Sequence, residues 1–433
     1  MSSTKATSRS AAPVSTSSEP VALYVHVPFC ASKCDYCDFA SVAGAVDAAT
    51  IDSYIAAVVR SLRDDFAPEI LADVPTLYVG GGTPSLLGAD GLRRLLTEIT
   101  DIATLRADAE ITVEANPDSV DDALVSALSA LQADLIPAGV LRVSLGVQSF
   151  DDEVLSILGR RHDAAAARQA LTLLADAGLR VSLDLMCGIP GQSPESWRAS
   201  LDAAIASGVG HVSVYPLTVE EGTPLARSVR AGSVEEPDSD IAADMMETAD
   251  AVLREAGIER YEIANYARPG QESRHNTGYW TGVEYLGIGP SAASMLSVRT
   301  AAKTFLERDL GLVTECTASE MPVEAGDIVA RVRYAQPFGL AAFLSGEGNQ
   351  AVESEWLTAH EASREDAMLG LRLCRGIDQE LADEAGVIDV LERLSSDGLV
   401  ERATTDDASD RWRLTHHGWL IANEVFGAVW SQE

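Results

Sequence analysis

Basic residues are scarce in this chain of 433 residues, and their scarcity limits the partners it can have. There are 32 lysines and arginines against 66 aspartates and glutamates, a formal net charge of −34. Proteins that hold nucleic acids use lysine and arginine to neutralise phosphates, so we expect no nucleic-acid partner. An anionic membrane surface is disfavoured for the same electrostatic reason.

Long hydrophobic runs are also missing. No stretch approaches the roughly 18 apolar residues that a membrane-spanning helix needs, which leaves at most a peripheral association with a membrane. Residues 1–20 are rich in Ser, Ala and Thr and lack the apolar core of a secretory signal. We expect a disordered tail there and a cytoplasmic protein. A transit peptide is the weaker alternative, because only Lys5 and Arg9 are basic before Glu19.

Cysteine is sparse, but half of the six cysteines fall within eight residues, at Cys30, Cys34 and Cys37. A secreted chain would more readily pair its cysteines in disulfides, whereas an intracellular chain uses such a group to bind metal. The scattered cysteines, which we expect to be inert thiols, are Cys187, Cys316 and Cys374.

Short apolar runs alternate with amphipathic runs over the first half of the chain. The apolar runs predict strands at Ala22–Val27, Thr76–Val79, Glu110–Glu114, Val140–Gly146, Arg180–Met186 and His211–Leu217. The amphipathic runs predict helices at Ile51–Asp65, Gly91–Ile102, Val120–Leu131, Asp152–Leu158, Ala164–Ala177 and Pro194–Ser207. Six such units indicate an α/β fold with a parallel sheet, and the polar residues at the strand ends favour a partial TIM-like (β/α)6 barrel.

The pattern changes twice after the barrel. We expect the tail at 1–20, the partial barrel at 21–255, a connecting or substrate-facing segment at 256–355, and a small winged-helix-like α+β module at 356–433. From Trp356 onward there are seven bases and sixteen acids, a net charge of −9. That balance argues against a DNA-binding role for the module and makes a transcription factor the weakest functional hypothesis.

The spacing of the clustered cysteines is C-x3-C-x2-C. Three thiolates on one short loop can bind three irons of a [4Fe–4S] cubane. The fourth iron then stays open to another ligand, which points to catalysis or substrate binding. A structural zinc site usually has four ligands in paired spacing, and three unrelated buried thiols are the plainest alternative.

This spacing, with Tyr36 before the last cysteine, resembles the signature of the radical S-adenosylmethionine superfamily. The resemblance implies that the open iron chelates the amino and carboxylate groups of S-adenosylmethionine. One-electron reduction then cleaves the sulfonium to a 5′-deoxyadenosyl radical. The run Gly80-Gly81-Gly82-Thr83 resembles the glycine motif of the superfamily, whose backbone meets the methionyl amino group; taken alone it is equally a tight turn.

Later polar residues resemble the branch of the superfamily that contains HemN and HemW proteins. Glu114 ends a predicted strand, where it could bind ribose hydroxyls or an ammonium, or be a turn residue before a helix capped by Asp118. Gln148, Arg160 and Asp184 taken singly are ordinary structural residues, but they fall within the Val-Gln-Ser-Phe, Gly-Arg-Arg-His and Asp-Leu-Met-x-Gly-Ile-Pro-Gly-Gln patterns of that branch. The resemblance implies cofactor contacts for Tyr24, Tyr36, Gly81, Gly82, Thr83, Glu114, Gln148, Arg160 and Asp184.

Three features resemble the HemW heme chaperones more than HemN, the oxygen-independent coproporphyrinogen dehydrogenase. HemN has a further cysteine where this chain has Phe39, and HemN has an ordered arm where this chain has its low-complexity tail. The third is the H-N-x-x-Y-W motif of the chaperones, matched by His275, Asn276, Tyr279 and Trp280. Histidine beside aromatic rings suits heme, although packing within a loop explains the same residues.

We therefore expect a heme-binding trafficking protein with a radical S-adenosylmethionine core that passes heme to an unidentified acceptor protein. Its cofactors would be the [4Fe–4S] cluster, S-adenosylmethionine and heme, with His275 as a candidate axial ligand. The runner-up is the oxidative decarboxylase of coproporphyrinogen III in porphyrin biosynthesis. A methyltransferase or another radical enzyme with a non-heme substrate is a third hypothesis. Either a monomer or a homodimer is compatible with the sequence.

Overall fold

The computed structural model of the chain describes residues 20–304, 329–336, 339–346, 353–404 and 410–431. The predicted tail, apart from Pro20, and Cys316 lie outside these residues.

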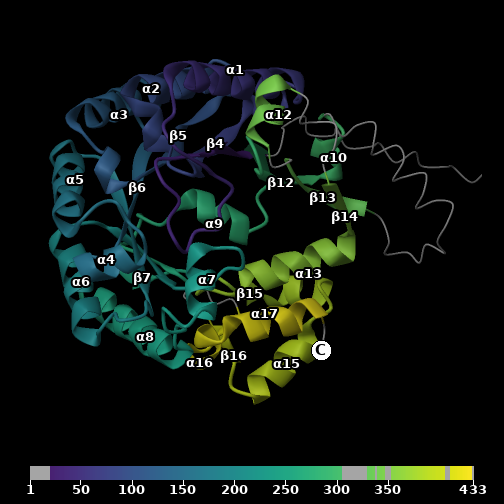
Figure 1. Cartoon of the computed structure of the whole chain (residues 1–433). Coiled ribbons are helices and arrows are strands. Elements are labelled where there is room, and N and C mark those ends of the chain that lie inside the picture. The colour runs from purple at the N-terminus through teal and green to yellow at the C-terminus, as the bar shows by residue number, and fades with distance from the viewer. Residues whose placement is uncertain (1–19, 305–328, 337–338, 347–352, 405–409, 432–433) are drawn as a thin grey trace, which may run out of the picture.

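One curled sheet dominates the molecule (Figure 1). Its centre is parallel and confirms the six predicted strands, with ends that differ by up to five residues. The central strands are β1 (Ala22–Val27), β4 (Val74–Gly81), β5 (Leu105–Ala115), β6 (Val140–Gln148), β7 (Arg180–Cys187) and β8 (His211–Pro216). The sheet ends in separate edge strands and does not close on itself, so the barrel is partial.

Helices cover the outer, convex face of this sheet (Figure 1). Several begin at an Asp or Ser whose side chain accepts a hydrogen bond from a backbone N–H of the first turn, as Asp121 and Ser193 do. Leucines and valines of the helices and strands meet between the two layers in the main core. The helices are α1 (Ala48–Asp64), α2 (Gly88–Thr100), α3 (Asp122–Leu135), α4 (Asp152–Ile157), α5 (Ala164–Asp176), α6 (Pro194–Ala206), α7 (Pro224–Arg230) and α8 (Ser239–Glu255).

The stretch 256–355, expected to be a connecting segment, supplies strands to both edges of the same sheet. On one edge β10 (Asn265–Ala267) joins β8, and β9 (Glu259–Arg260) joins β10. On the other edge β11 (Tyr285–Ile288) is parallel to β1. Beyond it follow the antiparallel strands β12 (Ala293–Ser297), β13 (Val329–Ala335) and β14 (Glu353–Thr358). Between β10 and β11 the short helix α9 (Arg274–Trp280) lies within the concavity of the curled sheet (Figure 1).

Two smaller pieces complete this part of the chain. A two-stranded ribbon of β2 (Phe29–Cys30) and β3 (Val42–Ala43) brackets the cysteine loop. The short helices α10 (Val298–Ala301) and α12 (Leu340–Ser345) lie near the β12–β14 edge (Figure 1).

The C-terminal elements form a compact module with its own core. A helix, a strand, two helices and two strands follow one another, which is the order of a winged helix. They are α13 (Ala359–Gly370), β15 (Ile377–Asp378), α14 (Gln379–Glu384), α15 (Ile388–Ser396), β16 (Val400–Thr404) and β17 (Asp410–Leu414), followed by α16 (His416–Leu420) and α17 (Ala422–Ser431). The exact domain boundaries stay predictions. Among the described helices, none combines the length and apolarity needed to cross a membrane.

Candidate functional site

Of the three clustered cysteines, Cys30 ends β2, and Cys34 and Cys37 lie on the loop between β2 and β3, shortly after the first strand of the sheet. All three are free thiols. Backbone bonds fix the loop: Gly44 N donates to Cys30 O at 2.9 Å, and Cys37 N donates to Cys34 O at 3.3 Å. His26, from β1, donates from Nε2 to Ala40 O at 2.7 Å. The loop is therefore held at the carboxyl end of the parallel strands.

Donors from two neighbouring turns reach the cysteine sulfurs. Arg160 donates from Nη1 to Cys34 Sγ at 3.4 Å, and its Nη2 donates to Asn116 Oδ1 and to Gly146 O. Thr83 Oγ1 lies 3.8 Å from Cys30 Sγ. The Arg160 guanidinium places a positive charge beside the Cys34 sulfur, and burial raises the pKa of Cys37.

Within the described residues, no three Cys, His, Asp or Glu side chains are arranged to hold a single metal ion. Three cysteines of a cubane bind three different irons, so they need not converge on one point. The donor set of three free thiols on one loop, with a cation beside one of them, fits a [4Fe–4S] cluster.

A cavity of about 390 Å³ opens beside this loop. Its wall includes all three cysteines and eight of the nine predicted cofactor residues, namely Tyr36, Gly81, Gly82, Thr83, Glu114, Gln148, Arg160 and Asp184. The ninth, Tyr24, stands behind the wall, where its hydroxyl donates to His26 Nδ1 at 2.9 Å. The structure thus gathers residues from the strands β4 to β7, from the turn of Arg160 and from the cysteine loop around one space of the size of a small-molecule site.

The glycine run joins the end of β4 to the cysteine loop. Gly82 N donates to Val27 O at 2.8 Å, and Thr83 N donates to Phe29 O at 2.7 Å. A Cβ atom on Gly82 would lie 2.6 Å from Phe29 O, which real structures do not tolerate. Close backbone approach is therefore the reason for glycine at this position.

Two buried carboxyl groups face the cavity. Glu114 accepts a hydrogen bond of 2.7 Å from the Tyr78 hydroxyl and one of 2.9 Å from Gly81 N. Asp184 accepts one of 3.3 Å from Ser144 Oγ. Burial raises the pKa of Glu114 to about 7 and that of Asp184 to about 6. At neutral pH the pair can therefore exchange a proton or bind a cationic group.

Gln148 reaches the cavity from a distorted strand end. Its φ is 67°, a left-handed conformation that residues other than glycine seldom adopt. The β6–β7 register shifts between Gly146 and Gln148, which is a bulge that redirects the chain at the rim of the sheet.

Several residues of the cavity wall were not predicted from the sequence, because the strands were identified by their apolar residues alone. Polar residues recur at every second position, as in Arg142 and Ser144 or in Ser213 and Tyr215. Alternate residues of a strand point to the same face. This period of two was the available signal for a polar inner face, and the four residues line the cavity.

Helix α9 carries the H-N-x-x-Y-W motif, and its residues point in different directions. Asn276 lines the cavity. His275 is only 2% exposed; its Nδ1 is 2.8 Å from Thr76 Oγ1 and its Nε2 is 2.8 Å from the Tyr279 hydroxyl. Burial lowers the pKa of His275 to about 3, so the ring is neutral at physiological pH.

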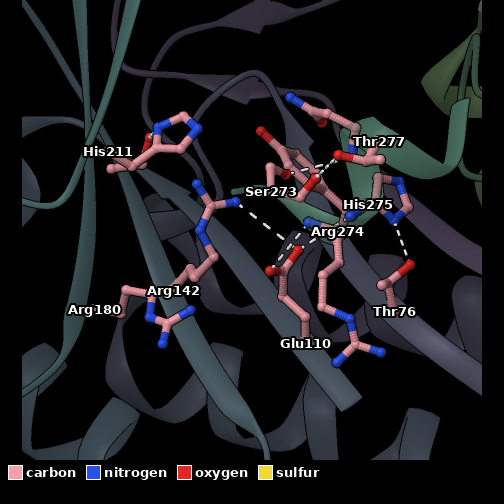
Figure 2. A network of polar contacts seen from close by, with 12 residues as sticks. Thr76, Glu110, Arg142, Arg180, His211, Ser273, Arg274, His275 and Thr277 are labelled. Carbon is pink, nitrogen blue, oxygen red and sulfur yellow. Dashed lines mark hydrogen bonds and ion pairs between the residues drawn. The ribbon is translucent and has the colours of Figure 1, made fainter. Parts of the chain in front are cut away.

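Buried contacts fix where α9 begins. The Ser273 hydroxyl accepts a hydrogen bond from Asn276 N at 3.3 Å. Glu110 Oε1 accepts from His275 N at 3.1 Å, and Oε2 accepts from Arg274 N at 3.3 Å (Figure 2). An acid at the amino end of a helix stabilises its free N–H groups, so a residue of β5 anchors the motif inside the sheet.

Trp280, at the other end of α9, faces the C-terminal module. The guanidinium carbon of Arg372 lies 4.3 Å from the centre of the Trp280 ring, a cation–π contact. Of the four motif residues, then, one lines the cavity, two are packed behind it, and one contacts the neighbouring module.

Known proteins are similar to this chain in sequence and in fold. Residues 24–204 match the family described as the radical SAM superfamily. The heme chaperone HemW of Mycobacterium tuberculosis is 36% identical over 409 residues, which cover 94% of each chain. The heme chaperone HemW of Escherichia coli is 33% identical and covers 94% of this chain and 97% of its own. The solved structure of Escherichia coli HemN, a coproporphyrinogen III oxidase, superposes with a TM-score of 0.72 over 96% of this chain and 91% of its own, at 21% identity.

Proposed function

Because the chain belongs to the HemW family of the radical SAM superfamily, we propose that it binds heme and delivers it to acceptor hemoproteins. One observation carries this proposal: Asn276 of the H-N-x-x-Y-W motif lines the same cavity as Cys30, Cys34 and Cys37. The site proposed for heme and the site proposed for the cluster are therefore two parts of one space. We place the protein in the cytoplasm, as a monomer or a homodimer, with its acceptors unidentified.

We propose that the three cysteine thiolates hold a [4Fe–4S] cluster. When bound, that cluster supplies the electron that cleaves the sulfonium of S-adenosylmethionine. The chain's own share is to bind and orient. Arg160 donates a hydrogen bond to Cys34 Sγ. The Gly81–Thr83 backbone allows the methionyl group to come close. The carboxylate oxygens of Glu114 and Asp184 can accept hydrogen bonds from amino or hydroxyl groups of the cofactor.

His275 is the candidate iron ligand for heme. A neutral imidazole is the form that binds iron, and the low pKa of this buried ring keeps it neutral. Both ring nitrogens are engaged, however, by Thr76 and Tyr279. Ligation through Nε2 therefore requires the Tyr279 hydroxyl to turn away first, so we expect heme binding to be slower than a diffusion-limited encounter.

A heme titration of the anaerobically reconstituted protein, followed at the Soret band, tests the function. We expect stoichiometric binding that is weakened at least tenfold in His275→Ala, and no loss in His417→Ala, because His417 is exposed on the far module. Coproporphyrinogen III turnover is measured on the same sample. Formation of vinyl product that depends on S-adenosylmethionine would instead assign the decarboxylase function. Equal heme affinity in wild type and His275→Ala would remove His275 as the ligand.

A further inference from the structure

Arg142 is a buried cation whose one ion pair among the described residues is long. It lies on the inward face of β6 and is 2% exposed, yet it forms part of the cavity wall. The nearest carboxylate oxygen is Glu110 Oε1, 3.9 Å from Nη1 (Figure 2). That distance exceeds a hydrogen bond. Among the described residues its buried Nε has no acceptor.

Glu110 forms a long ion pair with this guanidinium but does not hydrogen-bond it. Both of its oxygens already accept backbone hydrogen bonds, from Arg274 and His275 at the start of α9. The other neighbour of the guanidinium in Figure 2 is His211, whose ring nitrogens are engaged by Ser182 and Tyr261. Burying a charge without hydrogen bonds is costly, so the position calls for an anion from the cavity.

The cavity places this cation away from the cluster end. Gly146, whose carbonyl accepts from Arg160 beside Cys34, is four residues beyond Arg142 on the same strand, roughly 13 Å at the usual rise of a strand. Arg142 is therefore set back from the cysteine loop along β6. The residue suits a second carboxylate, on a ligand that shares the cavity with Asn276.

We propose that Arg142 is the carboxylate-binding residue for the ligand of this cavity, and that the carboxylate is a propionate of heme. This inference rests on the proposed function. Arginine binds carboxylates with two parallel hydrogen bonds and keeps its charge when buried. Heme carries its negative charge on two propionates, and a residue of the proposed heme motif shares the wall with Arg142. The edge of the macrocycle that bears the propionates thus enters first.

Heme and heme dimethyl ester, in which both propionates are blocked, are titrated against wild type, Arg142→Met and Arg142→Lys. We expect wild type to bind heme about tenfold or more tightly than the ester, the factor typical of a hydrogen bond to a charged group. In Arg142→Met the ratio of the two affinities falls to about one, and in Arg142→Lys it is intermediate. The matched control is Arg180→Met, on the neighbouring strand in register with Arg142 but outside the cavity wall, and it keeps the wild-type ratio.

Three results would overturn the inference. In the first, wild type binds heme and its ester equally well. In the second, Arg142→Met loses affinity for both by the same factor, the mark of a structural role. In the third, the variant loses affinity for S-adenosylmethionine, which would assign the guanidinium to that cofactor. If wild type binds neither tetrapyrrole, the proposed function fails and the inference falls with it, a result distinct from the other three.

Discussion

The ring of Tyr78 stands between Glu114 and His275. Its hydroxyl donates to Glu114 Oε1 at 2.7 Å, and its ring centre lies 5.1 Å from that of His275. The wall between the cavity and the motif helix is thus a single side chain thick here. A ligand that moves the phenol of Tyr78 will displace both the buried acid and the imidazole.

The buried acid should give the protein a measurable pH dependence. Burial raises the pKa of Glu114 from its ordinary 4.5 to about 7, so the folded protein holds this proton more tightly than the unfolded chain. The contribution of Glu114 to stability is complete below pH 4.5 and is lost as pH rises toward 7. We compare the free energy of unfolding of Glu114→Gln with that of wild type. The difference, variant minus wild type, should rise by about 2 kcal/mol from pH 5 to pH 8.

Urea unfolding of both proteins at the two pH values measures this difference. The comparison with the variant is needed because His275, whose pKa is lowered to about 3, acts in the opposite direction between pH 3 and 6.5. Asp184 acts in the same direction as Glu114, at lower pH. Parallel pH profiles for wild type and Glu114→Gln would contradict the assignment. Glu384→Gln, at an exposed position on α14, serves as the control and should leave the profile unchanged.

Each cysteine of the loop should be required for the cluster. Replacing Cys34 by alanine leaves two thiolates and removes the acceptor of the Arg160 hydrogen bond, so we expect iron and sulfide content after anaerobic reconstitution to fall to near zero. Cys374→Ala, outside the loop, should retain wild-type iron. Wild-type iron content in Cys34→Ala, Cys30→Ala or Cys37→Ala would exclude that residue as a ligand.

A methyl group on Gly82 should disturb the same loop without touching a cysteine. The added carbon would lie 2.6 Å from Phe29 O, so the loop backbone must shift. We expect a loss of about 2–4 kcal/mol in stability and a lower yield of reconstituted cluster. Gly427→Ala, in α17 with no atom near its added carbon, should be neutral or slightly stabilising. Equal melting temperatures for the two variants would contradict the role given to Gly82.

The contact between Arg372 and Trp280 should couple the C-terminal module to the motif helix. A double-mutant cycle with Arg372→Met and Trp280→Leu should give an interaction energy of about 1 kcal/mol in the free energy of unfolding. Arg375→Met, at an exposed position three residues along the chain, should show no coupling with Trp280→Leu. If the effects of Arg372→Met and Trp280→Leu on the free energy of unfolding simply add, the cation–π contact does not couple the C-terminal module to α9.

Much of this arrangement follows from local patterns. The central strands are buried on both faces, so their apolar runs are unmistakable, and the spacing of Cys30, Cys34 and Cys37 marks the site. The edge strands β9 and β10 are two and three residues long, too short to show a period. The pairing of Ala22 with Tyr285 joins residues far apart in sequence, and no local pattern encodes it.

The role of the inner face was also hidden. The alternation marks Arg142 and Glu110 as inward-facing, but their role depends on α9, which only the folded chain brings inside the sheet (Figure 2). The direction in which each motif residue points likewise depends on tertiary contacts, such as Thr76 with His275.

The placement of α9 within the curled sheet has a consequence for biosynthesis. During translation the three thiols leave the ribosome early, whereas Asn276 and the strand that flanks β1 follow much later. A nascent chain can present its cysteines, but it lacks one wall of the cavity until Tyr285–Ile288 has paired with β1. Maturation of the iron–sulfur centre is therefore expected to be post-translational, and truncation before β11 should yield a chain that cannot retain it.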